Sequence, residues 1–445
     1  MAACAWWAAP AYYALAAGAS GGRHRRSRLD IVEAKARQTS WRPGDFWDYV
    51  ASLNKGKRLD EALQAFEWWK QQPGYRAREE HFVRFMVMAS KAGQPHAAQG
   101  VFDGMEAMQV RPSVVGFSAL VQSYAESGEV EGAQSAMKRM LDTGIQPNVV
   151  TYGGLIRAYG KRGLFDEMAK VVNTMKTVRC EPDFFVYKNV IEAYASGGLV
   201  GRMDKAFKAM RADGWIPDSD ILNLLAQGYA SMGMIKEMEG AQGELRRIKG
   251  WPREESVRAC ALAYIRHNQF YQMEGFVKSL GMKRIGGNLL WNLLLLAHAA
   301  NFSMKSLQRE AVNMWSARCA PDVTTFNIRA LALSRMQMLW DLHVLVQHMR
   351  AESVRPDLVT YGALVDAYAI ARLLPRLPEQ LDELDMADTI PDVRTDPLVF
   401  QAFGRGRFHA FCDAYVRSSS TTLVNYSTLT TAYLDARRTS GTSPV

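Results

Sequence analysis

The chain has 445 residues, of which 48% are hydrophobic and 22% are charged. This ordinary composition excludes a collagen-like, a largely disordered or a disulfide-stapled protein. The formal net charge is +9, which permits an anionic partner without identifying one. Four arginines and no acid lie in the first 28 residues, and removing them would lower the charge from +9 to +5. The position of the charges is therefore more informative than their sum.

The amino-terminal segment is apolar and uncharged over residues 1–22 and continues into the basic sequence RHRRSR. A secretory signal would carry its positive charge before the apolar stretch, and Pro10 and Gly18 interrupt any membrane span. An acid-free, alanine-rich leader that ends in arginines is typical of an organelle transit peptide. Its uncharged start favours the chloroplast, with the mitochondrion as the alternative. We assign residues 1–43 to this transit peptide and a linker.

Residues that could hold a metal or a nucleotide show no recognisable pattern. The five cysteines form no CxxC pair, the eight histidines form no HExxH, and there is neither a P-loop nor a strand-associated GxGxxG. We therefore predict no metal site and no cofactor, and we expect reduced, buried thiols.

Three residue types recur along the chain at an interval of 35 residues. The prolines are Pro112, Pro147, Pro182, Pro217 and Pro252, the glycines are Gly93, Gly128, Gly163, Gly198 and Gly233, and the tyrosines are Tyr124, Tyr159, Tyr194, Tyr229 and Tyr264. After one unit that is a residue short, the proline spacing resumes at Pro321, Pro356 and Pro391. A fixed period shared by three residue types indicates a repeat protein.

One period, residues 114–148, contains the pattern of two helices. The first apolar face follows the i, i+3, i+4, i+7 spacing of a helix through Phe117, Leu120, Val121 and Tyr124, and the second passes through Val130, Ala133, Met137 and Met140. Gly128 separates the two helices, and Gly144 with Pro147 closes the unit. No segment alternates with period two for long enough to indicate a sheet. We predict an all-α fold in which successive helical hairpins stack, with the periodic methionines and tyrosines in packing roles.

Three phrases carry a family resemblance: PNVVTYGGLIRAYGKRG from Pro147, PDVTTFNIRALALSRM from Pro321 and PDLVTYGALVDAYA from Pro356. They closely resemble the pentatricopeptide repeat family. Tetratricopeptide repeats, with a period of about 34 and a different tryptophan and glycine signature, are a clear second. The resemblance implies a right-handed superhelical solenoid of helix-turn-helix repeats. Aligned on the proline, residues 44–392 divide into ten repeats, nine of 35 residues and one of 34, which resembles the P-type class built from 35-residue repeats only.

The carboxy-terminal part departs from the period. We assign residues 393–436 to a degenerate repeat and a capping helix, and residues 437–445 to a disordered tail. Neither the HxE and CxxC zinc site of a deaminase-like domain nor an acidic cluster suited to a nuclease is present. We therefore predict that the protein is not an enzyme.

Members of this family read single-stranded RNA at about one base per repeat. The resemblance implies that the fifth and the last residue of a repeat select the base, while the second residue clamps it. The matching base-selecting pairs are Ser118 with Asn148, which resembles an adenine pair, and Asn292 with Asp322 and Asn327 with Asp357, which resemble uracil pairs. The matching clamp residues are Val115, Val150, Phe185, Leu289 and Val359.

Other repeats depart from this pattern. Gly153 provides no side chain at its fifth position, and Asp220 and Glu255 place acids where an apolar clamp is expected. Two alternatives are open. Lys188, Arg253 and Arg258 hold the RNA backbone without reading sequence, or the central repeats have lost RNA recognition and serve to pack or to bind protein.

The expected function is that of an organelle protein that binds single-stranded RNA, acting in transcript stabilisation, intron splicing or rRNA and mRNA maturation. The alternative is a structural scaffold of an organelle ribosome or transcription complex. The expected partners are organellar RNA and other RNA-processing or ribosomal proteins, with no membrane, and the protein is expected to be a monomer.

Overall fold

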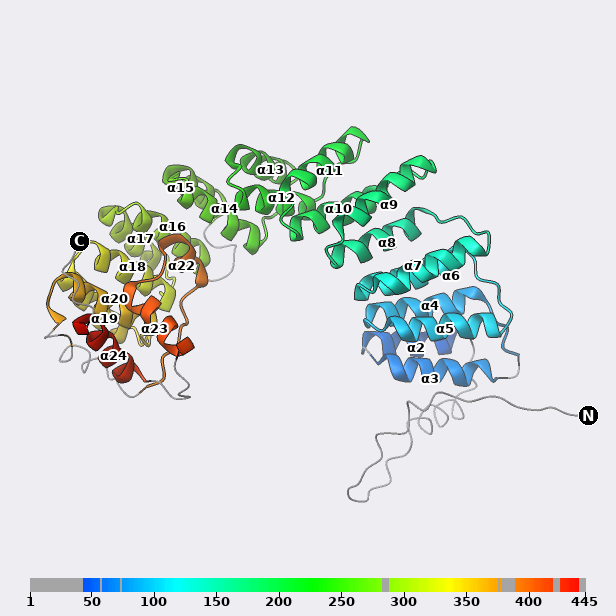
Figure 1. Ribbon diagram of the computed structural model, residues 1–445, viewed down its shortest axis with the longest axis horizontal. Helices are drawn as coiled ribbons and strands as arrows, with labels where there is room; N and C mark the ends of the chain where they lie inside the picture. Colours follow the sequence, from blue (N-terminus) through cyan, green and yellow to red (C-terminus); the bar gives the residue numbers. More distant parts are fainter. Residues whose placement is uncertain are drawn as a thin grey trace, which may run out of the picture. The chain divides into compact units, whose positions relative to one another are not determined.

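The computed structural model describes residues 43–439 except 57, 73, 282–287, 375–376, 378–388 and 419–424. These residues form 22 helices and no strand (Figure 1). The chain divides into two compact units, Met1–Ala193 and Tyr194–Val445, called unit 1 and unit 2 below. Residues 1–42 of the expected transit peptide and residues 440–445 of the expected tail lie outside the described residues.

Unit 1 consists of stacked helical hairpins. Its helices are α2 (Pro43–Lys55), α3 (Leu59–Lys70), α4 (Glu79–Lys91), α5 (Pro95–Ala107), α6 (Val114–Ser127), α7 (Val130–Asp142), α8 (Val149–Lys161), α9 (Phe165–Thr177) and most of α10 (Phe184–Ser196). First helices of neighbouring hairpins pack on one another, α4 on α6 and α6 on α8. The second helices α3, α5 and α7 also contact the first helix that follows each of them. The two contacts together propagate the stack.

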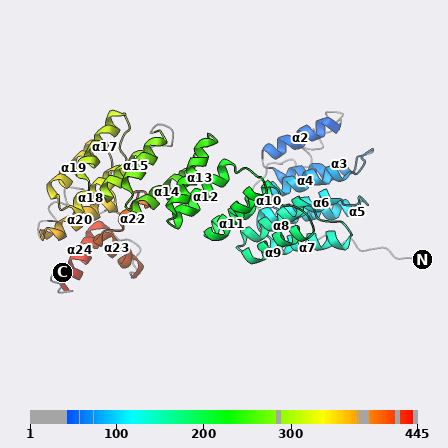
Figure 2. The ribbon, with the colours of Figure 1, turned by 90° about the horizontal axis from the view of Figure 1, so that it is seen from above.

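Unit 2 repeats this arrangement. Its helices are α11 (Val200–Ala212), α12 (Ser219–Ser231), α13 (Ile235–Arg247), α14 (Glu254–Arg266), α15 (Phe270–Ser279), α16 (Leu289–Ala300), α17 (Met304–Ser316), α18 (Val323–Arg335), α19 (Leu339–Ala351), α20 (Leu358–Ile370), α22 (Pro397–Phe403), α23 (Arg407–Ser418) and α24 (Tyr426–Thr439). α22 breaks the order, because it contacts α14 and α16 from much earlier in the chain (Figure 2). α24 continues to Thr439, so residues 437–439 of the segment expected as a disordered tail are helical.

The sequence explains the hairpins locally. Phe117, Leu120 and Val121 on α6 are no more than 1% exposed, as the helical spacing predicted. Gly128 ends α6 in the left-handed conformation, with φ of 73°, which glycine adopts without a steric penalty. The predicted all-α fold of helix-turn-helix repeats is confirmed. No helix among the described residues is both long and apolar enough to cross a membrane.

The periodic tyrosines have a structural role, as predicted. Four of the five, and Tyr368 as well, lie on a first helix with the hydroxyl bonded to a side chain of the preceding second helix, 25 residues earlier in the chain. The pairs are Tyr124 with Gln99 (3.1 Å), Tyr159 with Gln134 (2.5 Å), Tyr229 with Asp204 (2.8 Å), Tyr264 with Glu239 (3.0 Å) and Tyr368 with His343 (2.9 Å). The second-helix methionines Met140, Met175 and Met210 are fully buried. Both periodic residue types therefore belong to the core rather than to a binding surface.

Candidate functional site

In the three predicted base-selecting pairs, the last residue of the repeat caps the first helix of the next repeat. Asn148 Oδ1 accepts a hydrogen bond from the backbone N–H of Thr151 (3.0 Å), and Asp322 Oδ1 accepts one from that of Thr325 (2.8 Å). Asp357 accepts from Val359 and Thr360 in the same way. Because an N-terminal cap of this kind contributes about 1 kcal/mol to helix stability, these side chains are held at the helix start whether or not a ligand is bound.

The structure brings all three predicted base-selecting pairs together. Asn292 Nδ2 donates to both carboxylate oxygens of Asp322 at 3.2 and 3.3 Å, and Asn327 Nδ2 donates to Asp357 Oδ1 at 2.8 Å. The Ser118 hydroxyl lies 3.4 Å from Asn148 Oδ1. Each pair thus joins the first helices of two neighbouring repeats.

A threonine completes each pair, and sequence reasoning missed it. The hydroxyl of Thr325 donates to Asn292 Oδ1 (2.7 Å), that of Thr360 donates to Asn327 Oδ1 (2.6 Å), and that of Thr151 lies 2.7 Å from the Ser118 hydroxyl. The sequence does contain a signal for these threonines, because each follows the last residue of a repeat by three positions, which is the spacing of a capping box. These hydroxyls fix the rotamer of the fifth-position side chain.

The first and the last of these pairs differ in accessibility. Asn148 is exposed, whereas its partner Ser118 is buried. Asn327 and Asp357 have no exposed surface, because residues 394–396 lie over them. Asn148 is therefore open to a ligand, and the Asn327–Asp357 pair is closed.

The predicted clamp residues are exposed in unit 1 and buried in unit 2. In unit 1, Val115, Val150 and Phe185 are 58%, 46% and 67% exposed. In unit 2, Leu289 and Val359 are buried, at 8% and 2% exposed. Only the clamp residues of unit 1 therefore present apolar surface to solvent.

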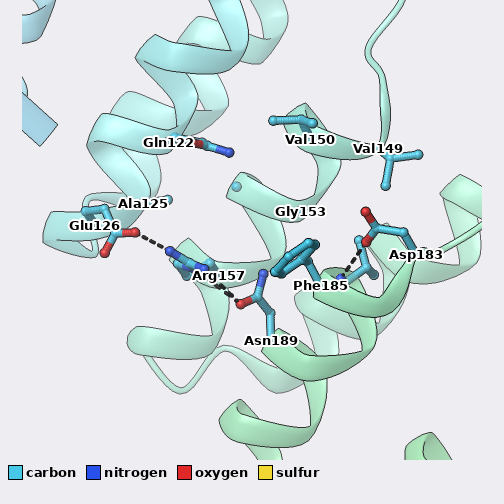
Figure 3. Close-up of a pocket in the computed structure, with 12 residues that line it drawn as sticks. Gln122, Ala125, Glu126, Val149, Val150, Gly153, Arg157, Asp183, Phe185 and Asn189 are labelled. Atoms are coloured by element: carbon cyan, nitrogen blue, oxygen red, sulfur yellow. Dashed lines mark hydrogen bonds and ion pairs between the residues drawn. The ribbon is translucent and has the colours of Figure 1, made fainter. Parts of the chain in front are cut away.

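A pocket of about 240 Å³ lies between the first helices of unit 1 (Figure 3). Val150 and Phe185 border it, and Gly153, the fifth residue of its repeat, leaves room that a side chain would fill. Pockets that enclose whole small ligands measure roughly 300–1,000 Å³, so this one suits a single flat group.

A guanidinium group lies in the floor of this pocket. Arg157 Nε and Nη2 donate to Asn189 Oδ1 at 3.3 and 3.2 Å, and Arg157 also pairs with Glu126, which accepts from Lys161 Nζ at 3.0 Å. Burial alone would raise the pKa of Glu126, but the hydrogen bond from Lys161 and the charge of Arg157 outweigh it and lower that pKa. Sequence reasoning missed Arg157, although it follows Gly153 by four residues and so lies on the same helix face.

The three predicted backbone-holding cations are placed differently from one another. Arg253 pairs with Asp220, the acid at a clamp position, and Arg258 pairs with Glu254 (2.9 Å) and Asp396. Lys188 is half-buried on α10. Both arginines are therefore engaged by carboxylates of the same unit.

One described cluster could coordinate a metal ion by its geometry: Glu274, His298 and Glu310 place one ligand atom each within 4.8 Å of one another. Lys278 pairs with Glu274 at 2.5 Å, and Asn313 donates to Glu310 at 3.0 Å, so both carboxylates already have partners. Burial lowers the pKa of His298 despite both glutamates. These contacts are those of a buried structural cluster.

Sequence comparisons identify the repeats. A pentatricopeptide repeat domain matches residues 100–162 and 135–197, and a PPR repeat matches residues 185–215. Three chloroplastic pentatricopeptide repeat-containing proteins of Arabidopsis thaliana are similar to this chain. They are 33% identical over 125 residues (28% of this chain, 25% of the relative), 31% over 78 residues (18% and 16%) and 31% over 90 residues (20% and 18%). The chain thus spans a quarter or less of the length of these relatives.

The fold is similar to that of the pentatricopeptide repeat protein PPR10 from maize. The two share 20% sequence identity at a TM-score of 0.54, over 94% of this chain and 67% of the maize chain. PPR10 in complex with an 18-nt psaJ RNA element aligns with a TM-score of 0.45 and 18% identity, over 94% of this chain and 72% of that one. The matched models and the helical hairpins agree, and residues 100–215 of this chain consist of pentatricopeptide repeats.

Proposed function

We propose that this protein binds single-stranded RNA as a monomer, through the first helices of unit 1, and catalyses no reaction itself. The observation that carries the proposal is the pocket between α6, α8 and α10, where exposed apolar side chains border a fixed guanidinium group. Single-stranded RNA offers the matching chemistry, since its bases have flat apolar faces, polar edges and an anionic backbone.

Each side chain of the pocket has a role in this proposal. Val150 and Phe185 border the pocket and would contact the two faces of one base. Asp183 and Asn189 also line the pocket and offer hydrogen-bonding groups to its edge. Arg157 would exchange its ion pair with Glu126 for a phosphate oxygen.

We further propose ten repeats over residues 44–392, of the P-type class, on the regular spacing of the chain. The chloroplast is the proposed location, supported by the transit-peptide-like start and by the chloroplastic relatives. Occupation of a transcript would shield it from exonucleases or keep it from inhibitory pairing, in stabilisation, splicing or maturation of organellar RNA.

The test is selection of RNA from a randomised single-stranded library by the full chain, followed by affinity measurement at several salt concentrations. We expect enrichment of defined sequences and an affinity that falls with salt. Val150→Asp should abolish binding, while Leu141→Asp should not. Leu141 is the matched control because it is 48% exposed but lies on the second helix α7. Absence of enrichment, or equal binding by the two variants, would refute the proposal.

A second candidate function is a protein-binding scaffold in an organelle ribosome or RNA-processing complex. The observation that favours it is exposed apolar surface on the second helices of unit 2, where Tyr271 is 84% and Trp340 79% exposed. Tyr271→Ser with Trp340→Ser should release protein partners from the tagged chain in organelle extracts and leave RNA affinity unchanged. Retention of every partner would exclude this surface.

A further inference from the structure

We infer that residues 392–403, here called the C-terminal strap, bind the base-reading surface of unit 2 and compete with RNA for it. This inference rests on the proposed RNA-binding function. It adds an autoinhibitory contact, which restricts recognition to unit 1 as long as the strap is bound.

The strap runs back over first helices that precede it in the chain. At its start, the carbonyl of Asp392 accepts from the N–H of Leu358 (2.9 Å), and Arg394 donates to the carbonyls of Arg355 (2.7 Å) and Pro356 (2.9 Å). At its end, α22 contacts α14 and α16 (Figures 1 and 2). The strap therefore extends from α20 back to α14 and is no further layer of the stack.

Strap atoms occupy the hydrogen-bonding groups of one base-selecting pair. The Thr395 hydroxyl accepts from Asn327 Nδ2 (2.7 Å) and donates to Asp357 Oδ2 (2.8 Å). The backbone N–H groups of Arg394 and Thr395 donate to the same carboxylate oxygen, at 3.0 and 3.1 Å. The strap thus supplies a donor and an acceptor where a base edge would present them, and it leaves the pair no exposed surface.

Two further RNA-contacting positions are engaged by Asp396. Its N–H donates to the hydroxyl of Thr324 (3.0 Å), the second residue of the expected repeat 323–357. Its carboxylate pairs with Arg258, the fifth residue of the expected repeat 254–287. A carboxylate on Arg258 replaces the phosphate that this arginine would otherwise hold, since both anions accept from a guanidinium fork.

The helix α22 anchors the strap by apolar contact. Leu398, Val399 and Phe403 are buried. Arg335 donates to the carbonyl of Phe403 and lies over its ring, 4.6 Å from the centroid. RNA must displace both the polar and the apolar contacts, so its apparent affinity for unit 2 is reduced by the small fraction of molecules in which the strap is open.

The test compares nuclease footprints of the full chain and of a release variant, Asp396→Ala with Phe403→Ala, on the same selected RNA. These substitutions weaken the strap and leave Asn327 and Asp357 intact. We expect the footprint to lengthen by about four nucleotides, at about one base per repeat over the repeats that the strap covers. Asn327→Ala added to the release variant should shorten this gain, because it removes one of the base-selecting pairs that the strap covers.

Two additions keep the outcome decisive. Thr324→Val removes the hydroxyl that accepts from the Asp396 N–H and leaves a side chain of the same size. It should lengthen the footprint by less than the release variant does, and it remains informative even if the release variant folds poorly. Amide exchange in α14 and α18 should rise in the release variant and stay unchanged in the control Val416→Ala, which alters an exposed side chain on α23. If the wild type binds RNA and neither strap variant lengthens the footprint, the inference is wrong. If the wild type binds no RNA, the proposed function is wrong.

Discussion

Phe185 is the most exposed of the predicted clamp side chains, and its replacement by alanine tests the binding surface with little effect on folding. Two-thirds of its surface already faces solvent, and its contact with Phe184 is a single edge-to-face pair at 5.6 Å. Surface substitutions of this kind change the free energy of unfolding by about 0.5 kcal/mol or less. A loss of RNA affinity in Phe185→Ala therefore reports the lost contact with RNA.

The expected magnitude follows from the pocket geometry. Stacking of a base on an aromatic side chain contributes about 1–3 kcal/mol. Because Val150 borders the same pocket and remains to contact the base, we expect the lower part of this range, about 1–2 kcal/mol. This corresponds to a rise in Kd of about 5- to 30-fold.

Fluorescence anisotropy with a selected RNA measures this change. Phe185 carries no charge, so the dependence of log Kd on log salt should keep its slope while the whole curve shifts. Combination with Val150→Ala should give a coupling energy above about 0.5 kcal/mol, since both side chains contact one base. An unchanged Kd, or fully additive losses, would show that these two residues do not clamp a common base.

Four further predictions concern other residues. Glu126→Gln should free Arg157 and Lys161 for phosphate, tightening RNA binding and steepening the salt slope by about 0.7 per added contact; an unchanged slope would contradict this. Because the pKa of Glu126 is lowered in the folded state, the carboxylate stabilises the fold above its unfolded-state pKa near 4.5. This stabilisation is lost as the pH falls through the folded-state pKa. The thermal unfolding midpoints of the wild type and Glu126→Gln should therefore become equal in acid. Tyr229→Phe removes a hydrogen bond to a carboxylate and should lower the free energy of unfolding by about 1.5–3 kcal/mol, against about 0.5–1.5 for Tyr124→Phe, whose partner is neutral; equal losses in urea denaturation would argue against the charged bond. Gly144→Ala should lower the free energy of unfolding by about 1 kcal/mol, because its φ of 79° is unfavourable for alanine. No steric clash adds to this, since no atom lies within 4 Å of the added methyl. Arg179 has a positive φ at the equivalent turn, so Arg179→Gly should raise the free energy of unfolding.

The repeat period was sufficient to predict the hairpins, because the same local pattern sets each helix start and end. Helix α6 begins at Val114 and ends before Gly128, as its apolar spacing and its glycine indicated. The pairing of the fifth and last residues was implied by the family resemblance rather than by the period alone. The threonines were missed because their bonds to the fifth-position side chains cross between neighbouring first helices, although their spacing from the last residues is that of a capping box.

Features that depend on contacts outside the period could not be predicted. The ion pair of Arg258 with Asp396 joins residues 138 apart, in a segment that no longer follows the repeat. The pocket beside Gly153 exists because this residue has no side chain. In the sequence, the same glycine indicates only that its repeat lacks the usual fifth-position side chain. Its polar floor depends on Arg157 reaching Glu126 and Asn189 on two neighbouring helices, and spacing along one helix does not specify that.

A pair that fits the base-selecting pattern is thus closed to RNA. Asn327 and Asp357 have the required chemistry, but the same donors and acceptors bind Thr395 with near-ideal distances. Any substitution of this pair therefore weakens the strap and base recognition together, and the two effects on RNA affinity have opposite signs. Asn327→Ala in the wild type cannot by itself measure base reading, whereas the same substitution in the release variant can. Asn292 bonds Asp322 and Thr325, so Asn292→Ala provides the comparison in which the hydrogen bonds of Thr395 to Asn327 and Asp357 stay in place.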